Sequence, residues 1–332
     1  MNQKKIIVVG SGAWGTAVAN IFADAGSPTT LWGRDPGIVE SIQMRNENVK
    51  YLKGISLSKN LKATSGLENG LKESDVIVCS IPTQQIRSVF KPFAKLLAGK
   101  HLVNTSKGLE QGTHSRVSQI FSEISPTTRY TILSGPSFAL ETAMRLPTAV
   151  SLASKDIDDA TEIQKLTATP YFRGYTSTDV VGVELAGALK NVIAIACGMV
   201  TGLKLGYNAQ AALINRGIAE LIRLAKQEKS NPLTFLGLAG TGDLILTCTG
   251  PLSRNRKFGE LLAQGKKIDQ VQKELGGVAE GYYTAQSAYE FAHSKNLDMP
   301  IVEQMYKILY KGSTPNQALK ELMSRELKEE WS

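Results

Sequence analysis

The chain has 332 residues, of which 42% are hydrophobic and 20% are charged, which is typical of a globular protein with one large or two ordinary domains. Its formal net charge of +8 favours partners that carry negative charge, either nucleic acid or small phosphates. Because the lysines and arginines are scattered and aromatic residues make up only 7% of the chain, we expect no nucleic-acid-binding surface.

The cysteines and histidines are few and widely separated. The three cysteines, Cys79, Cys197 and Cys248, lie among apolar residues and have neither disulfide nor zinc-site spacing. This usage predicts buried thiols in a reducing cytoplasm. The three histidines form no local metal-binding pattern, so we expect no metal.

The first half of the chain alternates short apolar runs with helical patterns, such as those over residues 16–25 and 84–97. Such alternation predicts an α/β domain with a doubly wound, Rossmann-like parallel sheet. In this architecture ligands bind beyond the carboxyl ends of the strands, where the sequence here has small or polar residues. The expected strands are residues 6–9, 29–32, 76–79, 102–105, 131–133 and 149–152.

The second half has almost exclusively helical patterns. We therefore place a domain boundary at residue 178, with a dinucleotide-binding domain over 1–178 and an all-helical domain over 179–332. The longest apolar stretch, residues 179–203, contains Glu184 and Lys190, so we expect no membrane span. The expected helices are residues 179–200, 208–226, 254–264, 283–294 and 301–310.

The motif GSGAWG follows the first expected strand and precedes a helix. Its Gly10, Gly12 and Gly15 have the G-x-G-x-x-G spacing of dinucleotide-binding proteins. Gly10 permits a tight turn, Gly12 lets backbone N–H groups approach a pyrophosphate, and Gly15 permits close contact between helix and strand. The context favours a dinucleotide site over the alternative, a simple tight turn.

The end of the second expected strand bears on which dinucleotide binds. Arg34 comes first and Asp35 follows it. An acidic residue at this position would bond a ribose 2′-hydroxyl, whereas an arginine accommodates a 2′-phosphate. We therefore favour NADP, with NAD tolerated; the alternative is that Arg34 is a solvated loop residue.

Lys190 lies in an expected helix whose matching face is small or apolar. An ammonium on such a face loses hydration, so its pKa falls unless it is paired. A buried lysine of this kind can exchange protons with a substrate. The alternative, that Lys190 snorkels to the helix edge, is equally compatible with this stretch. The residues on its face are Val183, Ala186, Gly187, Ala194 and Cys197.

Ser253, Arg254 and Asn255 stand where a helix is expected to begin. Free backbone N–H groups, a cation and side-chain donors together suit a phosphate group. Ordinary N-capping by Ser253 is the competing explanation. Gly240, Gly242 and Asp243, shortly before, bend the chain toward this site or serve only helix packing.

Six motifs taken together resemble the bacterial-type NAD(P)-dependent glycerol-3-phosphate dehydrogenases over nearly the whole chain: GSGAWGTA, NTSKGLE, SGPSFALE, GALKNVIAIACGMVTG, GDLILTCTGPLSRNRKFG and VAEGYYTA. The resemblance implies an N-terminal dinucleotide domain, a helical C-terminal domain and commonly a homodimer. It also implies reversible conversion of glycerone phosphate to sn-glycerol 3-phosphate, which supplies phospholipid synthesis in the cytoplasm.

The same resemblance implies roles for individual residues. Lys190 corresponds to the group that gives and takes the proton at the substrate's C2 oxygen, and Asp243 could orient it. The implied substrate contacts are Lys107, Gly135, Ser137, Lys190, Asp243, Ser253, Arg254 and Asn255. The implied cofactor contacts, beyond the three glycines, are Ser11, Trp14, Arg34, Lys107, Ala139, Arg254, Val278 and Glu280.

Two other functions remain as alternatives. One is a 3-hydroxyacid or ketoacid reductase of the same architecture, which would also use a lysine on a helix. Its carboxylate substrate would not need the Ser253–Arg254–Asn255 helix start. The other is a dinucleotide-sensing regulator or nucleic-acid binder, in which Lys190 would be dispensable.

Overall fold

The computed structural model describes residues 3–276, 279–327 and 329–330, and its chain divides into two compact units. Unit 1 comprises Met1–Ser106 and Val117–Val180, and unit 2 comprises Lys107–Arg116 and Val181–Ser332. The short segment Lys107–Arg116 thus belongs to the second unit, although the chain on both sides of it belongs to the first.

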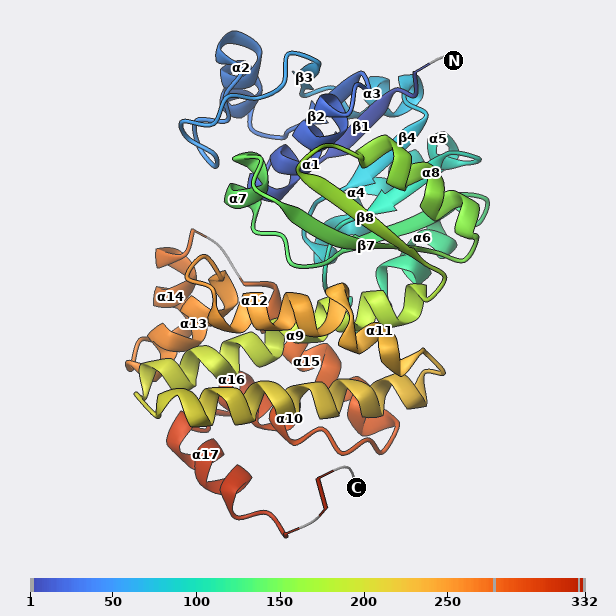
Figure 1. Ribbon diagram of the computed structural model, residues 1–332. Coiled ribbons are helices and arrows are strands. Elements are labelled where there is room, and N and C mark those ends of the chain that lie inside the picture. The colour runs from blue at the N-terminus through green and yellow to red at the C-terminus, as the bar shows by residue number, and fades with distance from the viewer. Residues whose placement is uncertain (1–2, 277–278, 328, 331–332) are drawn as a thin grey trace. The chain divides into compact units, whose positions relative to one another are not determined.

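Unit 1 is built on an eight-stranded sheet with the order β3-β2-β1-β4-β5-β6-β7-β8 (Figure 1). All neighbouring strands are parallel except β6 and β7, which are antiparallel, so the expected doubly wound sheet is confirmed with one antiparallel pair. The strands are β1 (Ile6–Val9), β2 (Thr29–Trp32), β3 (Leu61–Thr64), β4 (Val76–Cys79), β5 (His101–Asn104), β6 (Arg129–Ser134), β7 (Thr148–Ser154) and β8 (Phe172–Ser177).

The strands β1 and β4 are apolar throughout because both faces of the sheet are covered there. In β1, Ile6 and Val8 belong to one buried cluster, whereas Ile7 and Val9 belong to another. Alternate residues of a strand point to opposite faces, so a four-residue apolar run is what a doubly covered strand requires.

Two strands, β3 and β8, were not expected from the sequence. Both lie at the edges of the sheet, where one face is partly open to solvent. Their burial alternates along the strand, with Lys62 exposed in β3 and Arg173 exposed in β8. They therefore lack the continuous apolar run by which the central strands were identified.

The helices of unit 1 follow the strands, with one correction. The prediction of a single helix over residues 84–97 is wrong, because this segment is divided into 3₁₀ turns and the short helices α4 and α5. Pro92 lies in the second 3₁₀ turn, and its missing N–H interrupts the helical hydrogen bonds. The helices are α1 (Ala13–Asp24), α2 (Pro36–Arg45), α3 (Leu67–Glu73), α4 (Ile86–Phe90), α5 (Ala94–Leu97), α6 (Val117–Ile124), α7 (Ala139–Ala143) and α8 (Ile157–Thr167).

Within its described residues, unit 2 is entirely helical, as expected. Between α11 and α12 lies a short π-helix, η3 (Leu238–Gly242). The helices are α9 (Val180–Gly202), α10 (Gly206–Gln227), α11 (Pro232–Leu236), α12 (Asp243–Thr249), α13 (Arg254–Ala263), α14 (Ile268–Glu274), α15 (Glu280–Ser294), α16 (Pro300–Lys311) and α17 (Pro315–Met323).

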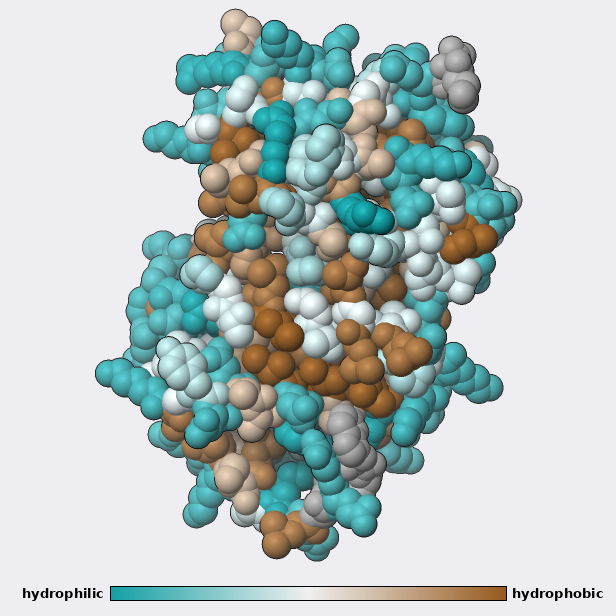
Figure 2. Space-filling view, in the orientation of Figure 1, coloured by the Kyte–Doolittle hydropathy of each residue, from teal (hydrophilic) through white to brown (hydrophobic). Residues whose placement is uncertain are grey.

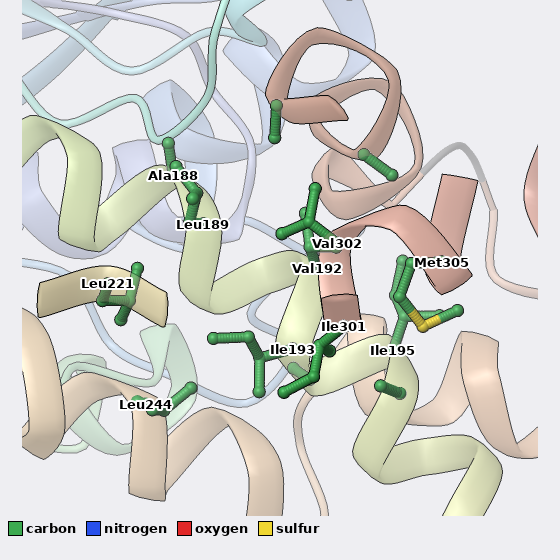
Figure 3. Close-up of a cluster of buried hydrophobic side chains, with 14 of the residues drawn as sticks. Ala188, Leu189, Val192, Ile193, Ile195, Leu221, Leu244, Ile301, Val302 and Met305 are labelled. Carbon is green, nitrogen blue, oxygen red and sulfur yellow. The ribbon is translucent and has the colours of Figure 1, made fainter. Parts of the chain in front are cut away.

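Helix α9 forms the centre of unit 2. It is long and apolar enough to cross a membrane, yet 94% of its most apolar stretch is buried inside the protein. Figure 3 shows its side chains together with those of other helices, among them Leu221 of α10, Leu244 of α12 and Ile301 of α16. The length and apolarity of α9 are thus those of a core helix.

Two glycines bring α13 close to α9. A β-carbon at Gly198 of α9 would lie 1.9 Å from the carbonyl oxygen of Arg256, and one at Gly259 of α13 would lie 1.9 Å from that of Ile195. Any larger residue would force the helices apart, because real β-carbons do not approach backbone atoms so closely. The helix that carries Lys190 is therefore packed directly on the helix that begins at Ser253.

Candidate functional site

The glycine loop of unit 1 depends on the absence of two side chains. Gly10 has φ +124°, and a β-carbon there would lie 2.3 Å from the carbonyl oxygen of Ser80. A β-carbon at Gly15 would lie 1.8 Å from the carbonyl oxygen of Gly10. Both glycines are therefore required for the tight turn and for the close contact of α1 with β1.

The N-terminus of α1 has the features of an anion-binding site. Its N-cap is Gly12, no side chain caps it, and its first turn contains no acidic residue. A β-carbon at Gly12 would meet nothing within 4 Å, so this loop faces open space. Uncapped N–H groups and the positive end of the helix dipole fit the pyrophosphate of a dinucleotide.

At the end of β2, the Asp35 carboxylate is already engaged. It caps α2 by accepting a hydrogen bond from the Gly37 N–H at 3.0 Å, and it pairs with the Lys50 ammonium at 2.9 Å. The bond to Lys50 lowers the pKa of Asp35. Arg34, beside it, is exposed. This arrangement suits a 2′-phosphate at Arg34 better than a 2′-hydroxyl at Asp35.

The remaining candidate residues of unit 1 lie near the ends of β1 and β6. Ser11 is buried in the glycine loop. Trp14 of α1 and Ala139 of α7 share one apolar cluster, so the structure brings these two together. Gly135 and Ser137 follow β6, and the Ser137 hydroxyl donates to the Gly135 carbonyl at 2.9 Å.

In unit 2, Lys190 is buried, with 6% of its surface exposed. Its Nζ donates to Asp243 Oδ1 at 2.8 Å and to Thr247 Oγ1 at 2.7 Å. The alternative of a snorkelling side chain is therefore wrong. The ammonium instead points into unit 2 and is held there by partners from α12.

Asp243 lies between two lysines. Its Oδ2 is 2.6 Å from the Nζ of Lys107, while its Oδ1 bonds Lys190. Burial works to raise the pKa of Asp243, but the charges of Lys107 and Lys190 outweigh it and hold the pKa below its usual value. The carboxylate is thus ionised and orients both ammonium groups.

The sequence left open whether the pKa of Lys190 rises or falls, and the structure gives the direction. Burial lowers it most; Asp243 opposes this change, while the positive charge of Lys107 adds to it. The result is a pKa of about 8. A lysine with this pKa can both give and take a proton near neutral pH.

Thr247 is a member of this site that sequence reasoning missed. Its hydroxyl donates to the backbone carbonyl of Asp243 at 2.6 Å, which leaves its lone pairs to accept from Lys190. A signal was available, because residues 243 and 247 are four apart and share one face of α12.

The backbone before Asp243 is unusual. The π-helix Leu238–Gly242 precedes it directly, and the Thr241 hydroxyl donates to the Phe235 carbonyl at 3.0 Å. A β-carbon at Gly240 would lie 2.0 Å from the same carbonyl oxygen. Such π turns are frequent at functional sites, and this one places Asp243 at the start of α12.

The start of α13 combines capping with contacts to the lysine helix. Ser253 is the N-cap and accepts from the Arg256 N–H at 3.2 Å, so the capping explanation is correct for this bond. The Asn255 amide donates to Asn191 Oδ1 at 2.9 Å and accepts from the Gly281 N–H at 3.0 Å. Asn191, next to Lys190, was not identified from the sequence.

Three further candidates complete the set. Arg254, the first residue of α13, is exposed, and Glu280 begins α15. Val278 lies outside the described residues. The segment that carries Lys107 is tied to α9 by an ion pair of 2.8 Å between Arg116 and Glu184. Glu184 therefore pairs with an arginine and not with Lys190.

One cluster in unit 1 was not expected. His101 belongs to β5, whereas Asp159 and Glu162 both belong to α8, and their ligand atoms lie within 4.8 Å of one another, as in groups that can hold a metal ion. However, Arg129 donates to both carboxylates at 2.8 Å. A guanidinium thus already supplies the positive charge that these carboxylates require.

Comparison with known proteins agrees with this geometry. The family model for the NAD-dependent glycerol-3-phosphate dehydrogenase N-terminus matches residues 5–160, and the model for the C-terminus matches residues 179–320. A curated relative from Geobacter metallireducens, named glycerol-3-phosphate dehydrogenase [NAD(P)+], is 46% identical over 98% of this chain and 99% of its own length. A relative of the same name from Carboxydothermus hydrogenoformans is 44% identical over 99% of both chains.

Solved structures give the same result. Glycerol-3-phosphate dehydrogenase from Coxiella burnetii matches with a TM-score of 0.93 and 35% identity over 97% of this chain and 99% of that one. A ketopantoate reductase from Ralstonia eutropha shares only the fold, with a TM-score of 0.58 and 12% identity over 95% of this chain and 99% of that one. The chain therefore belongs to the NAD-dependent glycerol-3-phosphate dehydrogenase family.

Proposed function

We propose that the chain is an NAD(P)-dependent sn-glycerol-3-phosphate dehydrogenase in which Lys190 is the acid–base group. The family membership and the names of relatives 44–46% identical to it support the reaction, which interconverts glycerone phosphate and sn-glycerol 3-phosphate. The observation that carries the residue assignment is the buried Lys190 ammonium bonded to Asp243. In this proposal residues 1–178 form the dinucleotide-binding domain, and residues 179–332 form the helical domain that carries the catalytic Lys190.

The nicotinamide cofactor, when bound, supplies or accepts the hydride at the substrate's C2 carbon. The N-terminal amides of α1 hold its pyrophosphate, with Gly10, Gly12 and Gly15 allowing the approach. Arg34 binds the 2′-phosphate, so NADP is preferred and NAD is tolerated. Further cofactor contacts are Ser11, Trp14, Lys107, Ala139, Arg254, Val278 and Glu280.

Lys190 provides the proton. During reduction its ammonium donates one proton to the C2 oxygen as negative charge develops there, and the amine is left neutral. During oxidation the neutral amine takes the hydroxyl proton back. Asp243 and Thr247 keep the Nζ atom in place in both charge states, because each bonds it within 2.8 Å.

The substrate's phosphate is held by the start of α13. Ser253, Arg254 and Asn255 supply a cation and donors at a helix N-terminus, and Lys107 adds a second cation. Gly135 and Ser137 are the substrate contacts assigned to unit 1. Fixing the phosphate fixes the position of C2, which lowers the entropic part of the barrier.

Parallel assays of phosphorylated and unphosphorylated substrates test this function. NADPH absorbance is followed with glycerone phosphate and, in parallel, with dihydroxyacetone and a series of 2-ketoacids. We expect turnover only with glycerone phosphate, because the helix start at Ser253 suits a phosphate. Faster turnover of a ketoacid would favour the hydroxyacid reductase alternative.

We also propose that the enzyme works in the cytoplasm to supply phospholipid synthesis.

We propose further that two copies of the chain form a homodimer. Figure 2 shows apolar surface gathered where α10, α11 and α12 lie in Figure 1, and Leu233 and Leu236 of α11 and Ile245 of α12 are exposed. Large apolar patches mark interaction surfaces. Light scattering during gel filtration should give twice the chain mass, and Leu233→Lys with Leu236→Lys should halve it.

A further inference from the structure

Asn48 is a fully buried polar residue beneath the glycine loop, in the segment that follows α2. Its side chain is 0% exposed. One Nδ2 hydrogen goes to the Ser11 carbonyl at 3.0 Å, and the other goes to the Thr16 hydroxyl at 2.8 Å. Its Oδ1 accepts from the Tyr51 N–H at 3.1 Å. Every donor of this amide is thus used, and two of the three bonds reach the loop or α1.

The bond to Ser11 determines the orientation of one peptide group. In a trans peptide the C=O and the following N–H point in opposite directions. Asn48 draws the Ser11 carbonyl toward the interior, so the Gly12 N–H is turned the other way. Space beside Gly12 is open, since a β-carbon at this residue would meet nothing within 4 Å.

The bond to Thr16 fixes the first turn of α1 relative to that peptide. Thr16 is 0% exposed, and its own N–H bonds the Gly12 carbonyl at 3.0 Å. One side-chain amide therefore joins the loop peptide and the helix turn whose N–H groups lie nearest to it. Ser11 is also confined from the side, since a β-carbon at Gly33 would lie 2.5 Å from its Oγ.

We propose that Asn48 is a positioning residue for dinucleotide binding, holding the Gly12 N–H and the first turn of α1 in the orientation that receives the pyrophosphate. The proposal rests on the function proposed above. Asn48 acts only through Ser11 and Thr16, since its own side chain is buried and reaches no ligand.

Asn48→Ala tests the proposal, with Asn60→Ala as a control. Asn60 also donates its side-chain amide to a carbonyl of α1, that of Ala23 at 3.2 Å, but at the opposite end of the helix. Asn60 is exposed whereas Asn48 is fully buried, so Asn60→Ala should cost less stability. The control shows whether the loss of any side-chain bond to α1 raises the Kd for NADPH, and thermal unfolding separates this from a general loss of stability.

The measurements are NADPH fluorescence titration, steady-state kinetics and thermal unfolding. We expect Asn48→Ala to raise the Kd and KM for NADPH about tenfold, because a buried hydrogen-bonding group is lost and the peptide is released. The KM for glycerone phosphate should stay within about twofold of wild type, as should every parameter of Asn60→Ala. An unchanged NADPH Kd in folded Asn48→Ala, or an equal rise in Asn60→Ala, would overturn the proposal.

Thr16→Val provides a second reading if Asn48→Ala does not fold. It removes only the hydroxyl that accepts from Asn48, and we expect a roughly threefold rise in the NADPH Kd with kcat unchanged. An unchanged Kd in this variant would equally contradict the proposal. If wild type itself neither binds NADPH nor turns over glycerone phosphate, the proposed function fails instead, so the two failures are distinguishable.

Discussion

The glycine loop of unit 1 and the Lys190–Asp243 pair of unit 2 handle charge in opposite ways. The loop offers backbone N–H groups, and its key residues, Gly10 and Gly15, matter because they have no side chain. The pair offers full charges on side chains that are almost entirely buried. Substitutions that add atoms to the glycine loop should therefore impair unit 1 most. Substitutions that remove a charged group from the Lys190–Asp243 pair should impair unit 2 most.

The two solutions differ in electrostatic cost. Backbone dipoles at the N-terminus of α1 carry only partial charge and lose little hydration. In unit 2, the ammonium groups of Lys107 and Lys190 both pair with the buried carboxylate of Asp243. Full charges at a buried place lose much hydration, so this arrangement depends on each group keeping its partner.

Lys190→Met should produce the largest effect. It keeps the length and packing of the side chain, but no proton donor remains at C2, so kcat should fall at least about a thousandfold. Lys107 still pairs with Asp243, so the carboxylate is not left alone and the melting temperature should be nearly unchanged or slightly raised. NADPH titration should show normal binding. Turnover within about tenfold of wild type would direct attention to Lys107 as the acid.

Adding a single methyl group to the glycine loop should produce the second-largest effect. Gly15→Ala places a β-carbon 1.8 Å from the Gly10 carbonyl oxygen, so the loop must shift. We expect the NADPH Kd to rise about a hundredfold, together with a lower melting temperature. Gly12→Ala meets no protein atom within 4 Å and should weaken NADPH binding while leaving stability unchanged. A stable Gly15→Ala variant that binds normally would refute the close-contact argument.

The pH dependence of the rate reports the charge state of Lys190. Reduction needs the ammonium, so its rate should fall up to tenfold per pH unit above about 8, the pKa of Lys190. Oxidation needs the neutral amine, so its rate should rise up to that pH and then level off. Asp243 raises the pKa of Lys190, and Asp243→Asn should therefore move both inflections to lower pH. Initial rates between pH 6 and 10 check both directions, and a flat reduction profile would contradict the assignment.

Arg34→Ala should have the smallest effect, confined to one cofactor. Only NADPH has a 2′-phosphate to lose, so its KM should rise about tenfold while that of NADH stays nearly constant. Equal changes for both cofactors would show that Arg34 does not contact this phosphate.

The sequence predicted the parts of the molecule that depend on local pattern. The apolar run Ile6–Val9, the three glycines and the apolar face around Lys190 each carry their signal within a few residues. The partners of Lys190 cannot be recognised from such a local pattern. Asp243 and Thr247 are 53 and 57 residues away in the chain, and they meet Lys190 only after α12 packs on α9. Asn48 stands in a polar stretch that reads as an ordinary turn, so its burial depends on the tertiary fold.

The π-helix Leu238–Gly242 has a consequence for insertions and deletions in this chain. A π turn holds one residue more than an α turn, so the segment before Asp243 has room for a residue that an α-helix would not accommodate. Successive residues of an α-helix are rotated by ~100° about its axis. An insertion or deletion that the π turn does not absorb would therefore turn the Asp243 carboxylate away from Lys190, although no charged residue had been altered. The length of this small segment is thus as constrained as the charged residue that follows it.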